Sequence, residues 1–541
     1  MATSGSQPPQ NIGELNLRVE PHGPTQAQLN DLAGRVMQHA SVTRTLANAR
    51  HALLSVAVHE PENAEKKATA PDSFLAVIQD YTNHRTLRVT GSIANSQNIA
   101  IEETSNPPLP SDNEFREAIE LVHSHPAFAN LREQFTPYPA MPYLTTNDLA
   151  DGTRQRVIAI GLLPRNPQFA HEIVSVNLHD RSVIRHDANA PAAGIAGPTT
   201  CGVALDAGQA TTSNAAGQVW ITVTQGNKTL WKFLAVRPAA SSGTRGSGVE
   251  LRFVDYKGKR VLYRAHVPIL NVRYDNDACG PYRDWQNQEG MLQANGTDVA
   301  PGFRLCNAPA KTILESGSDT GNYLGVAIYV QGLEVVLVSE MQAGWYRYVS
   351  EWRLHADGTI RPRFGFSAVK NSCVCNRHHH HAYWRFDFDI DTPGNNLVRE
   401  FNDPPIFPGT NWHDKKFEIK RFRDPSRKRK WRVLNTVSGD AYDIIPGAND
   451  GVATQSADWP FPQGDFWVLK YHGNELDDGV NQTGGPATSL EAHLDNFVNG
   501  ESVQNTDVVV WYAGHVLHDV HDDPPGVFGH TAGPDLKPVK W

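Results

Sequence analysis

The sequence predicts a mostly β protein, in which a large antiparallel β-sandwich follows two small α+β domains. Three observations support this fold class. At 541 residues the chain is too long for one small core, and a usual domain size of about 100–200 residues suggests about three domains. Helical periodicity is confined to the N-terminal third. From about residue 203 onward, β-rich runs such as VELRFVDYKGKRVLYRAHVPILNVRY alternate with turn signals.

The first small domain is expected at residues 21–105, after a disordered segment at residues 1–20. Thr25 is the candidate N-cap of a helix. The apolar residues that share one face of this helix at helical spacing are Leu29, Leu32, Val36 and Met37. The strand-like runs LLSVAVHE and FLAVIQDY follow, so the segment predicts a helix packed on a small sheet.

The second small domain is expected at residues 106–190 and repeats this order of elements. Ser111 and Glu114 form a capping box, and Pro126 ends the helix that it starts. The apolar stripe consists of Phe115, Ala118, Ile119 and Val122. The strand-like runs RVIAIGLL and IVSVNLHD follow. A stretch of small residues and prolines then predicts a linker to the sandwich, which is expected at residues 200–541.

Composition excludes some classes of partner. The net charge of −9, from 49 Lys and Arg against 58 Asp and Glu, argues against binding to nucleic acid or to an anionic membrane. The basic run KRFRDPSRKRKWR at residues 420–432 is interpreted as a solvated hairpin with its turn at Asp424. Five cysteines are few and odd in number, so no disulfide framework is expected.

The N-terminal segment MATSGSQPPQ has neither the basic nor the apolar region of a secretory signal. No later segment approaches the about 18 uninterrupted apolar residues that a membrane-spanning helix needs. The sequence therefore predicts a cytoplasmic protein without a membrane partner.

The stretch NSCVCNRHHHHAYWRFDFDID at residues 371–391 carries the strongest chemical signal. Residues two apart on a strand face the same side at about 6.5–7 Å, which is near enough for two imidazoles to bind one metal ion. His378 and His380 then share one face, and His379 and His381 share the other. A polar loop or a solvent-facing histidine run is the alternative for these four residues taken alone.

The residues downstream favour the metal site. The pattern His-x-His-x4-Arg-x-Asp-x-Asp, with Arg385 as its arginine, resembles the copper-binding strand of the copper amine oxidases. This resemblance assigns His378 and His380 as copper ligands. The family takes its third histidine from a strand that ends in Trp-Tyr near the C-terminus, and VVVWYAGHVLHDVHDD resembles that strand, with His518 at the ligand position. Three neutral imidazoles suit copper.

The resemblance also implies a peripheral cation site. Its matching positions are Asp387, Asp389 and Asp507, and calcium is the expected ion because its preferred ligands are oxygen atoms. The family layout of two small domains before a sandwich covers nearly the whole chain. A homodimer, a small-molecule substrate and O2 are implied by the resemblance in the same way.

Two tyrosines correspond to family positions at the active site. The run VLYRAHVPILNVRYDND resembles the stretch that leads to an active-site tyrosine, here Tyr274. The run AGWYRYVSEWRLHADGTI resembles the segment in which a tyrosine is converted to the topaquinone cofactor, here Tyr346. Tyr323 also follows an asparagine, but its surroundings do not resemble the cofactor segment.

The chain departs from the family pattern around the cofactor. Trp345 and Arg347 replace the asparagine and the acid that flank the quinone precursor, which puts topaquinone at Tyr346 in doubt. Gln288 stands where the family has its catalytic aspartate. An amide cannot accept the α-proton of an amine, and the loss of a general base lowers the rate by about 10²–10⁴. Glu289 is the adjacent substitute, although on a regular strand it points to the opposite face.

Cys373 and Cys375 precede the histidines, and three interpretations stay open for them: metal binding, a strained disulfide, or packing. Three functions stay open as well. The first is a copper-dependent oxidoreductase that has diverged from amine deamination, with Tyr346 as a redox residue. The second is an ordinary topaquinone amine oxidase that forms aldehyde, ammonia and hydrogen peroxide. The third is a noncatalytic copper-binding protein.

Overall fold

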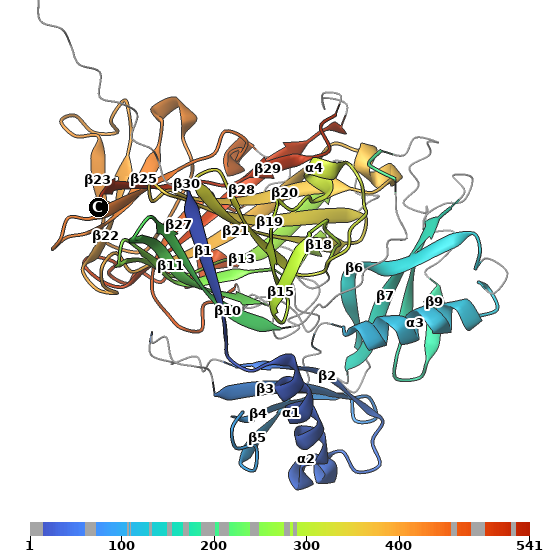
Figure 1. Ribbon diagram of the computed structural model, residues 1–541. Helices are drawn as coiled ribbons and strands as arrows, with labels where there is room; N and C mark the ends of the chain where they lie inside the picture. Colours follow the sequence, from blue (N-terminus) through green and yellow to red (C-terminus); the bar gives the residue numbers. More distant parts are fainter. Residues whose placement is uncertain are drawn as a thin grey trace, which may run out of the picture.

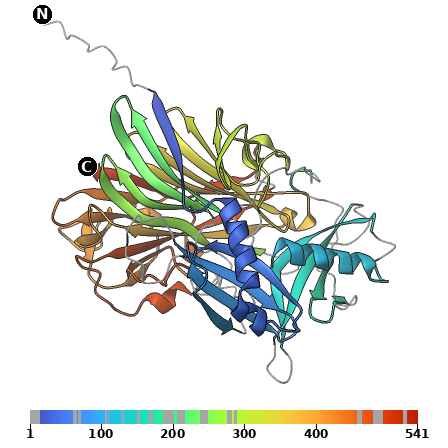
Figure 2. The same cartoon turned by 60° about the horizontal axis from the view of Figure 1, so that its bottom comes forward.

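Two large β-sheets pack against each other, and two small α+β units lie beside them (Figures 1 and 2). The computed structural model describes residues 14–541 apart from 60–65, 67–71, 105–107, 109, 129–131, 149–153, 166–171, 186–200, 205–215, 238–247, 275–281, 285–288, 456–462, 478–492 and 521–525. Over these residues, no helix is both long and apolar enough to cross a bilayer. The predicted mostly β fold class is confirmed.

The first large sheet has 10 strands among the described residues. In spatial order they are β1 (Leu15–His22), β10 (Gly217–Gln225), β11 (Lys228–Arg237), β12 (Glu250–Tyr256), β13 (Lys259–Tyr274), β21 (His378–Phe388), β28 (Val508–His518), β27 (Phe466–Lys470) and β24 (Ile419–Arg421), with β14 (Tyr282–Asp284) paired to β13. All of these pairs are antiparallel.

The second large sheet has 12 strands among the described residues. In spatial order they are β15 (Gly296–Ala300), β16 (Phe303–Cys306), β17 (Val326–Gln331), β18 (Glu334–Ala343), β19 (Tyr346–His355), β20 (Ile360–Ala368), β30 (Asp535–Lys540), β26 (Ala441–Ile445), β25 (Lys430–Asn435), β22 (Asn396–Phe401) and β23 (Trp412–Lys415), with β29 (His530–Ala532) paired to β20. The pair β16–β17 is parallel.

The histidine strand β21 lies in the middle of the first sheet, between β13 and β28, and every residue of it is buried. One face packs on the second sheet, as in the edge-to-face contact of Phe386 with Trp352 at 6.4 Å between ring centroids. The opposite face packs on a separate apolar cluster that includes Tyr383, Trp467 and Trp511. A strand covered on both faces is expected to be rich in apolar and aromatic residues, as this one is.

The first small unit pairs two helices with a four-stranded sheet. Its elements are α1 (Gln26–Gln38), α2 (Ala40–Thr45), β2 (His51–Val58), β3 (Ser73–Asp80), β4 (Arg85–Ser92) and β5 (Ile99–Thr104). The predicted cap is present, since the side chain of Thr25 accepts a hydrogen bond from the backbone of Gln28. Leu32 and Val36 of the predicted face are buried against the sheet.

The second small unit packs one helix on another four-stranded sheet. Its elements are α3 (Asp112–Ser124), β6 (Phe135–Asp148), β7 (Arg154–Pro164), β8 (Glu172–Asn177) and β9 (Ser182–Arg185). The predicted capping box of Ser111 and Glu114 forms. The carboxylate of Glu114 also pairs with the buried Arg156 at 2.6 Å, so one residue both caps the helix and ties it to the sheet.

The prediction of a disordered segment at residues 1–20 is wrong for its last part. Residues 15–22 form β1, which pairs with β10 at the edge of the first large sheet. Leu15, Leu17 and Val19 alternate with polar residues, a pattern typical of a half-buried strand, and they pack on the main core. Residues 1–13 lie outside the described part of the chain.

The basic run at residues 420–432 does not form the expected hairpin. Its turn is present as a short 3₁₀ helix, η4 (Pro425–Arg427), but the flanking strands β24 and β25 belong to different large sheets. Its charges are also not all solvated, because Arg421 pairs with the buried Glu400 at 2.7 Å. The remaining short helices are α4 (Ile313–Ser316), η3 (Ser372–Cys375), η5 (Ala453–Gln455) and η6 (Leu494–Phe497).

Candidate metal centre

Two neighbouring strands of the first sheet, β21 and β28, bring the predicted copper ligands to one place, and a third strand, β13, adds Tyr274. His378 is the first residue of β21 and His518 the last residue of β28, and the two face each other in register. Tyr274, the last residue of β13, faces His378 from the other side. Tyr346 comes from the second sheet, where it begins β19. The centre therefore lies at one end of the sandwich, between its two sheets.

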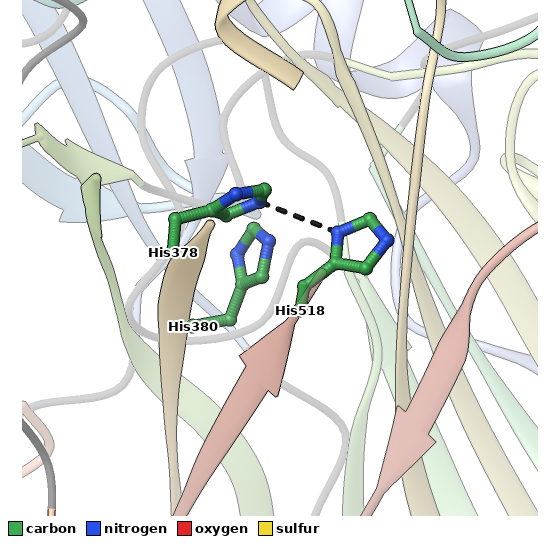
Figure 3. A group of neighbouring side chains, drawn as sticks. All are labelled: His378, His380 and His518. Carbon is green, nitrogen blue, oxygen red and sulfur yellow. Dashed lines mark hydrogen bonds between the residues drawn. The ribbon is translucent and has the colours of Figure 1, made fainter. Parts of the chain in front are cut away.

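The imidazoles of His378, His380 and His518 form a buried triangle (Figure 3). Each imidazole can offer one ring nitrogen, and these three nitrogen atoms all lie within 4.8 Å of one another. The dashed line in Figure 3 joins Nε2 of His378 to Nδ1 of His518, which are 3.3 Å apart. His380 lies beside this pair, as strand alternation predicts.

His379 and His381 point to the other face of β21. Nδ1 of His381 lies 2.8 Å from Nδ1 of His515, which belongs to β28. His515 in turn hydrogen-bonds through Nε2 to the carbonyl of Gly464 at 2.8 Å. The run of four histidines thus supplies His378 and His380 to a candidate metal site, whereas His381 forms a separate hydrogen-bonded pair with His515.

The donor set fits a copper ion. Nδ1 of His378 donates to the carbonyl of Asn376 at 2.5 Å, which leaves Nε2 to bind a metal, the usual arrangement for a histidine ligand. Both ring nitrogens of His380 are buried, and neither has a hydrogen-bond partner among the described residues. Burial lowers the pKa of His378 to about 3 and that of His380 well below its ordinary value. The imidazoles are therefore neutral, as metal ligands must be.

The hydroxyl of Tyr346 points into the histidine triangle. It hydrogen-bonds to Nε2 of His378 and lies 3.1 Å from Nδ1 of His518. Its ring stacks on Tyr348, with centroids 5.4 Å apart and planes 10° apart, and meets the edge of His380 at 4.4 Å. Tyr346 thus lies where the resemblance places the cofactor precursor, next to the candidate copper ligands.

The unusual neighbours of Tyr346 each have a partner. The indole of Trp345 donates from Nε1 to the hydroxyl of Tyr274 at 2.7 Å. The guanidinium of Arg347 makes two parallel hydrogen bonds to Asp319, at 2.6 and 3.0 Å, and donates to the carbonyl of Tyr346 at 3.1 Å. The reversal of charge at this position is therefore balanced by Asp319, which had no recognisable signal in the sequence.

Of the two candidates for the general base, Gln288 and Glu289, the structure describes only Glu289. Gln288 lies outside the described residues. Glu289 forms an ion pair with Arg237, and the two side chains are only 2% and 0% exposed. Its carboxylate is thus engaged by a buried guanidinium. Tyr323 belongs to a different core cluster from Tyr346, and the guanidinium of Arg304 lies 4.2 Å from the centre of its ring.

The three predicted calcium ligands also meet, but a lysine lies among them. Asp387, Asp389 and Asp507 can place oxygen atoms within 4.8 Å of one another. The ammonium of Lys66 lies 2.8 Å from a carboxylate oxygen of each of them. Burial, followed by repulsion from Asp387, raises the pKa of Asp389 to about 7 and that of Asp507 to about 6. Sequence reasoning missed Lys66, which lies 321 residues before Asp387.

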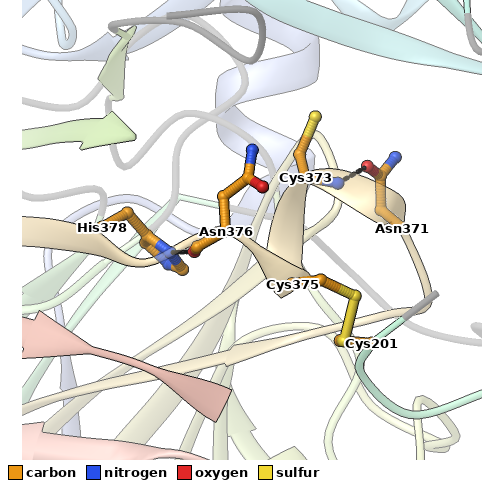
Figure 4. The surroundings of a disulfide bond; sticks show 6 residues. All are labelled: Cys201, Asn371, Cys373, Cys375, Asn376 and His378. Carbon is orange, nitrogen blue, oxygen red and sulfur yellow. Dashed lines mark hydrogen bonds between the residues drawn. A yellow bond between two sulfur atoms is a disulfide. The ribbon is translucent and has the colours of Figure 1, made fainter. Parts of the chain in front are cut away.

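The cysteines correct another expectation, because Cys375 forms a disulfide with Cys201 (Figure 4). The Cys-x-Cys pair does not close on itself, and Cys373 is disulfide-bonded too. Cys306 is buried and free. Cys201 and Cys375 are 174 residues apart, so no local pattern indicates that they pair. Asn376, whose carbonyl holds His378, directly follows Cys375, so the disulfide anchors the backbone behind a candidate copper ligand (Figure 4).

Comparison with known proteins agrees with this geometry. Residues 323–541 match the family model "Copper amine oxidase, enzyme domain". Copper amine oxidase 1 of Aspergillus niger is 27% identical over 175 residues, a match that spans 28% of this chain and 26% of that relative. The matched residues 323–541 include His378, His380 and His518.

Solved structures share the fold along nearly the whole chain. A copper-containing benzylamine oxidase from Hansenula polymorpha matches with a TM-score of 0.55 at 13% identity, over 99% of this chain and 94% of that one. A lysyl oxidase from Pichia pastoris matches with a TM-score of 0.57 at 11% identity, over 100% and 91%. At such low identity these similarities concern the fold alone. The enzyme-domain match over residues 323–541 and the shared fold agree with the resemblance of this divergent chain to the copper amine oxidases.

Proposed function

We propose that the chain is a copper-dependent oxidoreductase that uses O2 and has diverged from simple amine deamination. The observation that supports this most is the position of the Tyr346 hydroxyl, between His378 and His518. A phenol held there lies within reach of a metal bound by the triad. Tyr346 can therefore act as a redox residue or a ligand beside copper without first becoming a quinone.

Copper bound by His378, His380 and His518 would supply the one-electron chemistry that a reaction with O2 requires. The chain itself sets the conditions for it. The Asn376 carbonyl fixes the ring of His378 with Nε2 toward the site. All three imidazoles are buried and so shielded from bulk water, and burial lowers the pKa of His378 and His380, which keeps these two neutral. Tyr346 holds its hydroxyl group at the same place, within hydrogen-bond distance of ring nitrogens of His378 and His518.

The packing around Tyr346 supports an unmodified side chain. Conversion to a quinone needs a ring that can change its orientation. Here the ring of Tyr346 stacks on Tyr348 and makes an edge-to-face contact with His380, and both contacts restrict its reorientation. The two flanking side chains are tied down as well, Trp345 to Tyr274 and Arg347 to Asp319.

The ion pair of Glu289 and Arg237 supports the loss of amine deamination. A general base must be free to accept a proton from the substrate. A carboxylate paired with a buried guanidinium is a poor acceptor, because protonation would leave the positive charge of Arg237 buried without its partner.

The enzyme-domain match keeps the ordinary topaquinone amine oxidase as a second candidate. Both candidates have a small-molecule substrate, O2 as oxidant and, by family resemblance, a homodimeric assembly. A noncatalytic copper-binding protein is the remaining outcome. The three differ in the chemical state of Tyr346 and in oxygen consumption.

The test uses copper-reconstituted protein incubated in air. We expect the Tyr346 peptide at its unmodified mass, no coloured adduct with phenylhydrazine, and O2 uptake with a reducing substrate but not with simple primary amines. Tyr346→Phe, which keeps the stacked ring and loses the hydroxyl, should abolish the uptake. A mass gain at Tyr346 with a hydrazone band would contradict the proposal in favour of the amine oxidase. Copper binding without O2 uptake across reductants would favour the noncatalytic protein.

The disulfide bond between Cys201 and Cys375 argues against the predicted cytoplasmic location. Disulfides persist mainly in oxidising compartments, so we propose such a compartment instead. Thiol labelling of the protein taken directly from its host tests this. Full protection of Cys201 and Cys375 supports the oxidising compartment, and labelling of both supports the cytoplasm.

A further inference from the structure

The acidic cluster of Asp387, Asp389 and Asp507 is a poor fit to the calcium ion that the family resemblance implies. Calcium takes about 6–8 oxygen ligands at about 2.3–2.6 Å. In this structure the centre of the cluster contains the ammonium of Lys66, which contacts all three carboxylates. It lies 2.8 Å from the nearest oxygen of each.

Two aromatic rings complete the surroundings of this ammonium. Nζ of Lys66 lies 4.1 Å from the ring centroid of Tyr471 and 4.8 Å from that of Tyr263. Ring faces attract an ammonium group through their quadrupole, but they offer no oxygen ligand to a calcium ion. Three carboxylates with two ring faces form a site of the kind that selects an organic cation.

The positive charges that balance the three carboxylates also come from the chain itself. The guanidinium of Arg385 lies 3.7 Å from Asp387, and both of these side chains are fully buried. Lys66 and Arg385 together bring two positive charges to the three carboxylates, the same charge that one calcium ion would bring. Burial lowers the pKa of Lys66, but attraction to the three aspartates outweighs this and raises it above its ordinary value.

We propose that Lys66 is the resident cation of this cluster: its ammonium takes the place of the divalent metal and fastens the first small α+β unit to the sandwich. Lys66 lies in the connection between β2 and β3 of that unit, whereas the aspartates belong to β21 and to the residue before β28. The contact therefore crosses from one unit to the other. This inference is independent of the function proposed for the copper centre.

The proposal is tested with copper-loaded protein that has been freed of other metals. Terbium(III) serves as the probe for a calcium site, because the nearby rings of Tyr263 and Tyr471 would sensitise its luminescence. We expect no saturable terbium signal from the wild type and no rise in its melting temperature with calcium. Lys66→Ala exposes the three carboxylates, so it should gain a saturable signal and be stabilised by about 2 °C or more in 1 mM calcium.

Lys232→Ala is the matched control, since the exposed Lys232 also places its ammonium over a ring, that of Trp220, at 5.2 Å. It should behave as the wild type does. Elemental analysis of the wild type, after incubation with 1 mM calcium and desalting, decides the question even if Lys66→Ala does not fold. Calcium at background then supports the proposal. One calcium per chain in the wild type, or a wild type that calcium stabilises as much as it does Lys66→Ala, would overturn it.

Discussion

The two ends of the strand pair β21–β28 carry two clusters of potential metal ligands with different occupants. At one end, His378, His380 and His518 present buried ring nitrogen atoms toward one another. At the other end, Asp387, Asp389 and Asp507 surround the ammonium of Lys66. Both clusters arise from the same alternation of side chains along adjacent strands. The difference between them comes from one residue of another structural unit.

This contrast shows that a complete set of ligand positions does not by itself define a metal site. The histidine centre has strand-borne donors, a backbone carbonyl that orients one ring, and a phenol that points into it. The acidic centre has the donors, but its cation is already part of the chain.

The largest expected effect concerns the histidine centre. His380→Ala removes a ligand whose two ring nitrogens have no other described partner, so copper binding should be lost. His379→Ala is the control, because His379 is the neighbouring residue on the opposite face of the same strand and should leave copper binding intact. The measurement is copper content per chain after reconstitution and desalting. Equal losses in the two variants would show that strand alternation does not select the ligands.

A smaller effect is expected from the disulfide behind that centre. The double variant Cys201→Ser/Cys375→Ser frees the backbone next to Asn376, whose carbonyl orients His378 (Figure 4). Loss of such an outer contact lowers metal affinity by about 10–100-fold, and we expect the lower end of this range because the carbonyl itself remains. Competition with a chromogenic copper chelator measures the affinity.

Cys306→Ser is the control for the disulfide variant, since Cys306 is a free, buried cysteine of β16. It should retain the copper affinity of the wild type. An unchanged affinity in the double variant would mean that the disulfide has no part in orienting His378.

The sequence predicted the local features of the fold well. The caps at Thr25 and Ser111, the buried helix faces and the strand alternation at residues 378–381 all depend on residues close together in the chain, where periodicity is informative. It missed the strand β1, although Leu15, Leu17 and Val19 alternate as a strand requires. The partner of this strand, β10, lies about 200 residues later, so no local pattern revealed the pairing.

The parts of the site that could not be predicted are those made by distant partners. Lys66 and Asp387 are 321 residues apart, and Cys201 and Cys375 are 174 residues apart. The compensation of Arg347 by Asp319 is similar, because an ion pair between a strand residue and a loop residue leaves no periodic trace in a single sequence. Such contacts depend on topology, which motif matching by itself does not supply.

One crystallographic measurement tests the comparison as a whole. Crystals of the copper-loaded protein, grown with calcium present, would be measured on both sides of the copper absorption edge. The account predicts one anomalous copper peak per chain, bound by His378, His380 and His518, and continuous side-chain density of Lys66 among Asp387, Asp389 and Asp507. A copper peak at His379 or His381, or a calcium ion among the aspartates with Lys66 displaced, would contradict it.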